Sequence, residues 1–348
     1  MLRFCASSDN LATADLQQMY NMVDGSWSIK SSGGIHGTGS LNIDDLVATS
    51  GVDIALDNQP TWVVGFGFKL SGTRGPLLGR RTFLMFHDGE TTQCYLRSNL
   101  DSTLTFFRGN GTAIVTSTKP VPMNNYFYIE VKVTVHSASG AVEVRVNGEV
   151  YMTATGVNTQ TSGNNYANTI TFGTLTDAAS VVNDACDYDD VYICDTNGAN
   201  NNDFLGFVRV EHIGPSGAGG ASEWVPVGVG TNYQAVDDAT PNDETDYVLG
   251  SVVGKRDLYQ FGDVSIPSGQ QNAVLAVQTN VYWRKDFAGS RTIRPVIASA
   301  NGTALGTPLY HASKYYYDRQ IFETNPTSGT AWGISGVNNA QFGFEVAS

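Results

Sequence analysis

The feature that most limits the fold of this chain is a repeated two-residue alternation of apolar and other side chains. It is clearest in residues 61–70 and returns in residues 126–135 and 142–146. The apolar positions of the first segment are Trp62, Val64, Phe66, Phe68 and Leu70. Because successive side chains of a strand point to opposite faces, each segment is predicted to be a strand with one buried face.

Turn signals separate these segments. Asn147-Gly148 favours a type I′ hairpin turn before a returning strand at 149–153, and Gly109-Asn110-Gly111 indicates a second hairpin. One short helix is expected near residues 11–20, and loops at 214–220 and 237–246. Further strands are expected at 188–194, 204–213, 273–283, 292–298 and 341–346. Strands this evenly spaced predict an all-β antiparallel sandwich architecture.

The length and one polar stretch predict two domains. A chain of 348 residues is long for one sandwich and can bury two cores. Residues 195–203 are polar, contain Gly198, and separate two sets of strands. We therefore expect a first domain at 1–195 and a second β-sandwich domain at 201–348.

The charge excludes some partners. With 20 basic and 33 acidic residues the net charge is −13, which disfavours nucleic acid and a polybasic membrane contact. Asp9 precedes any long apolar stretch, so no signal peptide is expected, and no segment is apolar enough to span a bilayer. The four cysteines, which are expected to be buried and reduced, are Cys5, Cys94, Cys186 and Cys194.

The sequence contains no complete residue pattern for glycoside hydrolysis or for zinc binding. The nearest approach to a glucanase Glu-x-Asp-x-x-Glu strand is Glu244-Thr245-Asp246, where the third carboxylate position is Leu249. The histidines have no zinc-ligand spacing, and no Gly-x-Ser-x-Gly elbow is present. These isolated histidines are His36, His87, His136, His212 and His311. The sequence therefore predicts no catalytic residue and a protein that is not an enzyme.

Two clusters have alternative interpretations. A run of carboxylates, with Asn197 beyond it, is the best calcium candidate, but alternation sends Asp189 and Asp190 to opposite faces. This favours a solvated strand edge, so no metal ligand and no cofactor is predicted. The run comprises Asp184, Asp187, Asp189 and Asp190, and Asp195 lies beyond it together with Asn197. Tyr315, Tyr316 and Tyr317 are suited either to stacking on sugar rings or to a protein interface.

Several stretches together resemble the concanavalin A-like, laminin-G-type jelly roll over roughly the first 195 residues. They are 37–41, 62–69, 128–133, 144–148 and 188–193, in the order in which that family carries them. The version here is similar to domains of tailed-bacteriophage virion proteins, whose second part opens like residues 204–210 and closes like residues 325–332. The resemblance implies a lectin-like first domain.

The resemblance also implies a role, partners and a location. It implies an exterior structural protein of a phage particle, associated with a tail or fibre and with a host cell-surface glycan as a candidate ligand. The implied partners are other virion proteins and copies of the chain itself, with residues 201–348 as the attachment or oligomerisation domain. Assembly would take place in the bacterial cytoplasm. Three alternatives stay open: a capsid-decorating cement protein without ligand, a free carbohydrate-binding module, and a diverged glycosidase.

Overall fold

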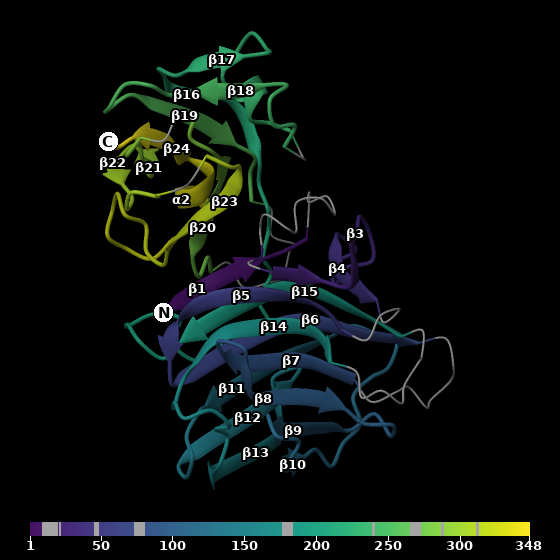
Figure 1. Ribbon diagram of the computed structural model, residues 1–348. Helices are drawn as coiled ribbons and strands as arrows, with labels where there is room; N and C mark the ends of the chain where they lie inside the picture. The colour runs from purple at the N-terminus through teal and green to yellow at the C-terminus, as the bar shows by residue number, and fades with distance from the viewer. Residues whose placement is uncertain are drawn as a thin grey trace. The chain divides into compact units, whose positions relative to one another are not determined.

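The chain folds into two compact units, Met1–Val210 and Glu211–Ser348, built almost entirely of strands (Figure 1). The computed structural model describes residues 1–8, 20, 22–44, 49–72, 81–175, 184–238, 241–264, 273–286, 289–310 and 313–348. The predicted all-β class is confirmed. The helix expected near residues 11–20 lies outside the described residues, apart from Tyr20.

The first unit is a sandwich of two antiparallel sheets, which confirms the predicted jelly-roll architecture. The eight-stranded sheet has the order β13-β12-β11-β6-β15-β4-β3, with β1 paired to β15. Its strands are β1 (Leu2–Ala6), β3 (Ser26–Lys30), β4 (Ser40–Asp44), β6 (Thr61–Gly72), β11 (Phe127–Thr134), β12 (Gly140–Val146), β13 (Glu149–Val157) and β15 (Asp184–Asp195).

The seven-stranded sheet of the first unit has the order β10-β9-β8-β7-β14-β5-β2. Its strands are β2 (Met22–Asp24), β5 (Thr49–Gln59), β7 (Arg81–Asp88), β8 (Thr91–Ser98), β9 (Leu104–Arg108), β10 (Ala113–Thr116) and β14 (Ala167–Leu175). Its strands β5, β14, β7, β8 and β9 lie side by side in Figure 1.

The core between the sheets is aromatic. Phe68 of β6 stacks on Phe83 of β7 with ring centroids 4.5 Å apart, and Phe66 meets Phe172 of β14 edge-on at 5.4 Å. Tyr188 of β15 contacts both β6 phenylalanines and donates to the Phe83 carbonyl over 2.9 Å. Its hydroxyl is thereby satisfied inside an apolar core. Phe66 and Phe68 are inward positions that the alternation predicted.

The predicted Asn147-Gly148 hairpin is confirmed. Both residues have positive φ, 51° and 81°, as a type I′ turn requires. The Asn147 side chain also accepts a hydrogen bond from the Tyr128 backbone N–H at 2.8 Å. The turn is thereby tied to the neighbouring strand β11.

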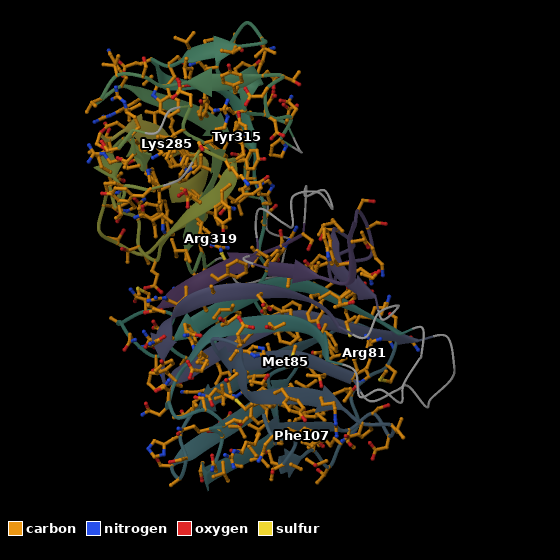
Figure 2. The ribbon with its side chains drawn as sticks, viewed as in Figure 1. Arg81, Met85, Phe107, Lys285, Tyr315 and Arg319 are labelled. Carbon is orange, nitrogen blue, oxygen red and sulfur yellow. The ribbon has the colours of Figure 1, made fainter. Side chains whose placement is uncertain are left out.

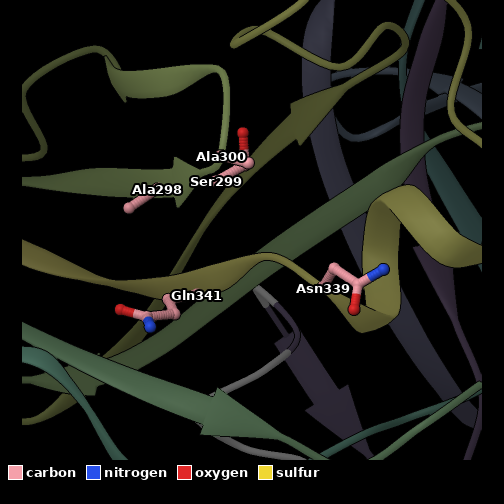
Figure 3. Close-up of a pocket in the computed structure, with 5 residues that line it drawn as sticks. All are labelled: Ala298, Ser299, Ala300, Asn339 and Gln341. Carbon is pink, nitrogen blue, oxygen red and sulfur yellow. The ribbon is translucent and has the colours of Figure 1, made fainter.

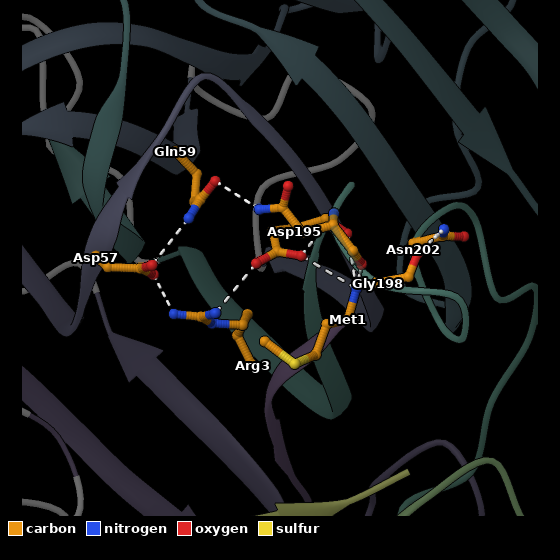
Figure 4. Close-up of polar contacts among 8 residues, drawn as sticks. Met1, Arg3, Asp57, Gln59, Asp195, Gly198 and Asn202 are labelled. Carbon is orange, nitrogen blue, oxygen red and sulfur yellow. Dashed lines mark hydrogen bonds and ion pairs between the residues drawn. The ribbon is translucent and has the colours of Figure 1, made fainter.

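A polar cluster around Met1 and Arg3 holds the start of strand β1 (Figure 4). The buried Asp195 carboxylate accepts from the Met1 amino group and from Arg3, each at 3.1 Å. Arg3 also pairs with Asp57, to which Gln59 donates at 2.8 Å. The carboxylate at the end of β15 is thus fully used inside the fold.

The second unit contains a five-stranded sheet of order β16-β19-β24-β21-β22 and two two-stranded sheets, β17-β18 and β20-β23. Its core cluster is Ile297, Trp332, Val337, Ala340 and Phe342. The elements are β16 (Pro215–Ser222), β17 (Val225–Val227), η2 (Tyr233–Ala235), β18 (Tyr247–Leu249), β19 (Arg256–Phe261), β20 (Val277–Trp283), β21 (Ile293–Ser299), β22 (Gly302–Leu305), β23 (Tyr316–Phe322), α2 (Ile334–Asn338) and β24 (Gln341–Val346). Within the described part of the chain, no helix has the length and apolar character needed to cross a membrane.

Two secondary-structure predictions near the start of this unit are wrong. Residues 214–220, expected as a loop, lie almost entirely in β16, an outer strand of small residues paired with β19. A side chain at Gly219 would meet the Leu258 carbonyl oxygen at 2.5 Å, so the close approach favours glycine here. Residues 204–213, expected as a strand, form none. The second compact unit begins at Glu211.

Candidate functional site

The face of the seven-stranded sheet that points away from the aromatic core carries a continuous row of side chains, of which Met85, Thr171 and Phe107 are buried and Asp53 and Tyr95 are partly exposed. Cross-strand pairing places Asp53, Thr171, Met85, Tyr95 and Phe107 next to one another on β5, β14, β7, β8 and β9. Their sequence neighbours point into the core, so alternation turns this row outward. Figure 2 labels Met85 and Phe107 on these strands.

Three of the outer side chains form a stack, which we call the aromatic–arginine stack: Tyr95, Phe107 and Arg97. The rings of Tyr95 and Phe107 are nearly parallel, with centroids 5.1 Å apart and planes 10° apart. The Arg97 guanidinium carbon lies 4.0 Å from the Phe107 centroid. A guanidinium over a ring face is favourable and holds a flexible side chain in one orientation. Phe107 is only 7% exposed.

Polar groups beside the stack are hydrogen-bonded to one another. Thr105 and Thr116 share a hydrogen bond of 2.9 Å across β9 and β10, and the Asn99 amide donates to Thr105 at 2.7 Å. At the other end of the row, the Thr171 hydroxyl donates to Asp53 at 2.6 Å. These bonds fix the positions of the side chains around the stack before any ligand arrives.

The loop 158–166 is fastened to β8 through Gln93. The Gln93 side chain accepts from the backbone N–H groups of Thr161 and Ser162, at 2.7 and 3.0 Å. It donates to the carbonyls of Asn164 and Tyr166, each at 2.9 Å. Because Gln93 is fully buried and two residues from Tyr95, the loop adjoins the row in a fixed position.

His87 lies near the end of β7, two residues after Met85 of the row. It lies opposite Thr169 of β14, and its Nδ1 is 3.2 Å from the Thr92 hydroxyl. Burial lowers the pKa of His87 below its ordinary value, although Asp53 and Glu90 act in the opposite direction. His87 is therefore predominantly neutral near pH 7, when one ring nitrogen is able to accept a proton.

The structure explains the carboxylate run differently from the solvated edge that the sequence favoured. Strand β15 lies between β6 and β4 inside the sheet, not at an edge. Asp187 accepts from Lys30 at 2.6 Å and from Asn42 at 2.7 Å, and Asp189 accepts from the Ile35 N–H at 3.0 Å. Both are 2% exposed. The solvated-edge prediction is wrong, because these carboxylates are buried and accept hydrogen bonds from protein groups in place of water.

Asp190 breaks the alternation that the sequence analysis assumed. The register between β15 and β6 shifts between Asp189 and Tyr192, and Asp190 has φ of 49°. Its carboxylate lies 3.1 Å from His36 Nε2 and accepts from the Val210 N–H at 2.7 Å. Among the residues that the structure describes, no group of three or more His, Cys, Asp or Glu is arranged to hold a metal ion. The Asp184 side chain lies outside that description.

The three consecutive tyrosines do not form one cluster. In the pairing of β20 with β23, Tyr316 lies opposite Trp283, whereas Tyr317 lies opposite Tyr282. Tyr315, labelled in Figure 2, stacks on Tyr282 with centroids 5.0 Å apart. Alternation thus puts Tyr315 and Tyr317 on one side of the β20-β23 ribbon and Tyr316 on the other.

Other residues named in the sequence analysis have structural partners. Glu244 pairs with Arg284, and His136 Nδ1 accepts from the N–H groups of Ala138 and Ser139, each at 3.0 Å. His311 lies outside the described residues. In the part of the chain that the structure describes, no disulfide joins the four cysteines, three of which are buried and Cys5 partly so.

A small pocket of about 190 Å³ lies in the second unit (Figure 3). Its lining residues are Ala298, Ser299, Ala300, Asn339 and Gln341. The two amide side chains already bond to the fold, since Gln341 accepts from Gly220 N–H at 2.7 Å and Asn339 donates to the Ser335 carbonyl at 2.8 Å. The pocket offers no group with recognisable chemistry.

Comparison with known proteins gives matches of fold only. No protein-family model matches the sequence, and no curated protein matches it significantly. The endo-β-1,4-glucuronan lyase of the fungus Trichoderma reesei matches with 11% identity and a TM-score of 0.43, over 56% of this chain and 95% of that one. The alginate lyase Aly36B matches with 13% identity and a TM-score of 0.37, over 60% and 98%.

A third solved structure, the alginate lyase AlgAT5 of polysaccharide lyase family 7, has 9% identity and a TM-score of 0.34, over 49% of this chain and 82% of that one. The prediction of a non-enzymatic protein is corrected at this point: the matched proteins are lyases, and what this chain shares with them is the fold alone, which does not support that prediction. The absence of a hydrolytic carboxylate pattern bears on hydrolysis alone. A lyase breaks its bond by elimination and not by hydrolysis, so a missing carboxylate pair does not exclude it.

Sequence reasoning missed the aromatic–arginine stack, although one signal was available. In residues 93–97, Cys94 and Leu96 alternate with Gln93, Tyr95 and Arg97, which places the last three on one face. That Phe107 lies beside Tyr95 follows only from the strand register.

Proposed function

We propose that the first unit binds a glycan on the outer face of its seven-stranded sheet. The observation that supports this most strongly is the aromatic–arginine stack of Tyr95, Phe107 and Arg97. Tyr95 is the partly exposed ring of the stack and offers apolar surface to the C–H groups of a sugar ring, whereas the buried Phe107 holds Tyr95 and Arg97 in place. Nearby polar groups set the orientation of the ligand.

Arg97 sets the class of glycan in this proposal. A guanidinium donates two parallel hydrogen bonds to a carboxylate, which a neutral sugar lacks. The Phe107 ring already orients the guanidinium, so little conformational freedom is lost when a ligand binds. An acidic polysaccharide is therefore the first ligand class to test.

We expect Arg97→Ala to weaken binding of an alginate oligosaccharide by about tenfold or more, since hydrogen bonds to charged groups contribute about 1.5–3 kcal/mol. Isothermal titration of the full chain measures this. The matched control is Lys119→Ala, which removes a cation 5.7 Å from the Tyr151 ring, outside the seven-stranded sheet. If both variants bind like the wild type, the stack is not the site.

The same mixtures also test for cleavage. New chain ends of the oligosaccharide would reveal cleavage by the wild type, and their absence with Arg97→Ala would place the cleavage site at the stack.

The second candidate function is an exterior part of a bacteriophage particle, assembled in the bacterial cytoplasm. The order of motifs in residues 37–193, continued by 204–210 and 325–332, is the observation that favours it. We propose residues 211–348 as the attachment unit, with other virion proteins or copies of the chain as partners. Antibodies against the chain should then label intact particles, and unlabelled particles from a lysate rich in the protein would contradict this role.

A further inference from the structure

Residues 203–210 cross the outer face of the eight-stranded sheet without joining its ladder. Their backbone instead donates to side chains that stand on that face. The Leu205 N–H donates to the Tyr192 hydroxyl at 3.1 Å, and the Gly206 N–H donates to Glu130 at 2.8 Å. The Val210 N–H donates to Asp190 at 2.7 Å.

Two phenylalanines and one aspartate of this segment add side-chain contacts. The Arg145 guanidinium carbon lies 3.9 Å from the centroid of Phe204, and Lys132 pairs with Asp203 at 2.9 Å. Phe207 meets Tyr128 at 4.8 Å between ring centroids. Phe207 is nevertheless 55% exposed, so its hold on the sheet is partial.

The acceptors beneath the segment are buried groups whose role depends on it. Glu130 and Asp190 are each 2% exposed, and Glu130 also accepts from the Tyr192 hydroxyl. Since no ladder hydrogen bond joins residues 203–210 to the sheet, they can leave it while every strand stays paired. Water then reaches the two carboxylates and solvates them.

We propose that residues 203–210 form a releasable strap that sets the length of free chain between the two compact units. When the strap is docked, the connection to the second unit begins at Glu211. When it is released, residues 203–210 become additional tether that extends up to roughly 25–30 Å. Asn197 stays bound to Gln59 at 2.9 Å and to Asp195 through its backbone N–H at 2.9 Å, so the tether begins after this anchored stretch.

His36 contacts the strap from the segment that precedes β4. Its ring lies 3.1 Å from Asp190 and 5.8 Å edge-on from Phe207, and the other charges that face it are Asp189 and Arg209. The hydrogen bond to Asp190 raises the pKa of His36 above its ordinary value of 6.5, although burial and Arg209 act against this. Because His36 and Asp190 both lie outside the strap, their ion pair stabilises the first unit itself below pH 6.5, and this contribution is lost as pH rises through the raised pKa.

Hydrogen exchange on the full chain tests the strap at the Leu205, Gly206 and Val210 amides. We expect these amides to be protected in the wild type and to exchange about tenfold faster or more in a Phe204→Ala/Phe207→Ala double variant. Tyr310→Ala, at a 76% exposed aromatic of the second unit, is the control and leaves the three rates unchanged. Wild-type amides that exchange at unfolded-chain rates, or a folded double variant with unchanged rates, would overturn the proposal.

The single variant Phe207→Ala supplies a second test if the double variant fails to fold. Because the Phe207 ring is 55% exposed, we expect this variant to fold, and its Gly206 and Val210 amides to exchange faster than in the wild type. Unchanged exchange at both amides in the folded single variant would overturn the proposal.

Discussion

Phe68→Ala is expected to destabilise the first unit by about 3–5 kcal/mol, the usual cost of truncating a fully buried phenylalanine. Phe68 is 1% exposed and touches the rings of Phe66, Phe83, Phe127 and Tyr188 from both sheets. Its loss leaves a cavity between the sheets that the strands cannot collapse to fill. Denaturant unfolding followed by exchange protection in β6 and β14 measures the change.

Tyr151→Ala is the control for this prediction, because Tyr151 is a partly exposed residue of the outer strand β13. We expect it to cost less than about 1 kcal/mol. Equal losses in the two variants would show that the sandwich core is not centred on Phe68.

Glu345→Ala should destabilise the second unit by about 3–5 kcal/mol. Glu345 is 1% exposed and pairs with both Arg256 and Arg294. Removing it leaves two guanidinium groups, each about one third exposed or less, without their shared carboxylate. Thermal unfolding of the second unit, followed by exchange protection in β24, measures the loss.

The same carboxylate makes the stability of the second unit depend on pH. Burial alone would raise the pKa of Glu345, but hydrogen bonds from Arg294 and Arg256 outweigh it and lower the pKa below the ordinary value of 4.5. Its contribution is therefore present above pH 4.5 and is lost as pH falls through the lowered pKa. Glu149, exposed and paired with Lys119, is the control position, where Ala should cost less than about 1 kcal/mol. A Glu345→Ala loss no larger than that would contradict the account of this pair.

The parts of the fold that the sequence predicts well are those where burial follows simple alternation. The inward face of β6 and of β11 is buried along its length, so the alternation from Trp62 to Leu70 marks β6 directly, although most of the outward positions are buried as well. The Asn147-Gly148 turn is local chemistry and needs no tertiary information. Both were predictable because each depends on residues adjacent in the chain.

The features that the sequence did not reveal depend on distant partners. Strand β16 has little side-chain pattern, because its small residues are selected by the close approach of β19. Residues 204–210 have the apolar composition of a strand, yet Glu130, Tyr192 and Asp190 bind their backbone in place of a neighbouring strand. Composition alone does not distinguish these two cases.

The candidate site also has one part that the sequence predicts and one part that depends on distant strands. The outward direction of Tyr95 and Arg97 follows from alternation in β8, but their proximity to Phe107 depends on the pairing of β8 with β9. The buried carboxylates of β15 were misplaced because the register shift at Asp190 is not written in the local sequence. Register and irregularities are set by the whole sheet.

The most direct test of the glycan proposal is a nuclear magnetic resonance titration of the isotope-labelled full chain with an alginate oligosaccharide. We predict that the largest amide shifts fall on Tyr95, Arg97, Phe107 and their neighbours in β7 to β9, and that they disappear in Arg97→Ala. Shifts confined to Tyr282, Tyr315 and Tyr317 of the second unit, or no shift on the seven-stranded sheet at saturating ligand, would contradict the proposal.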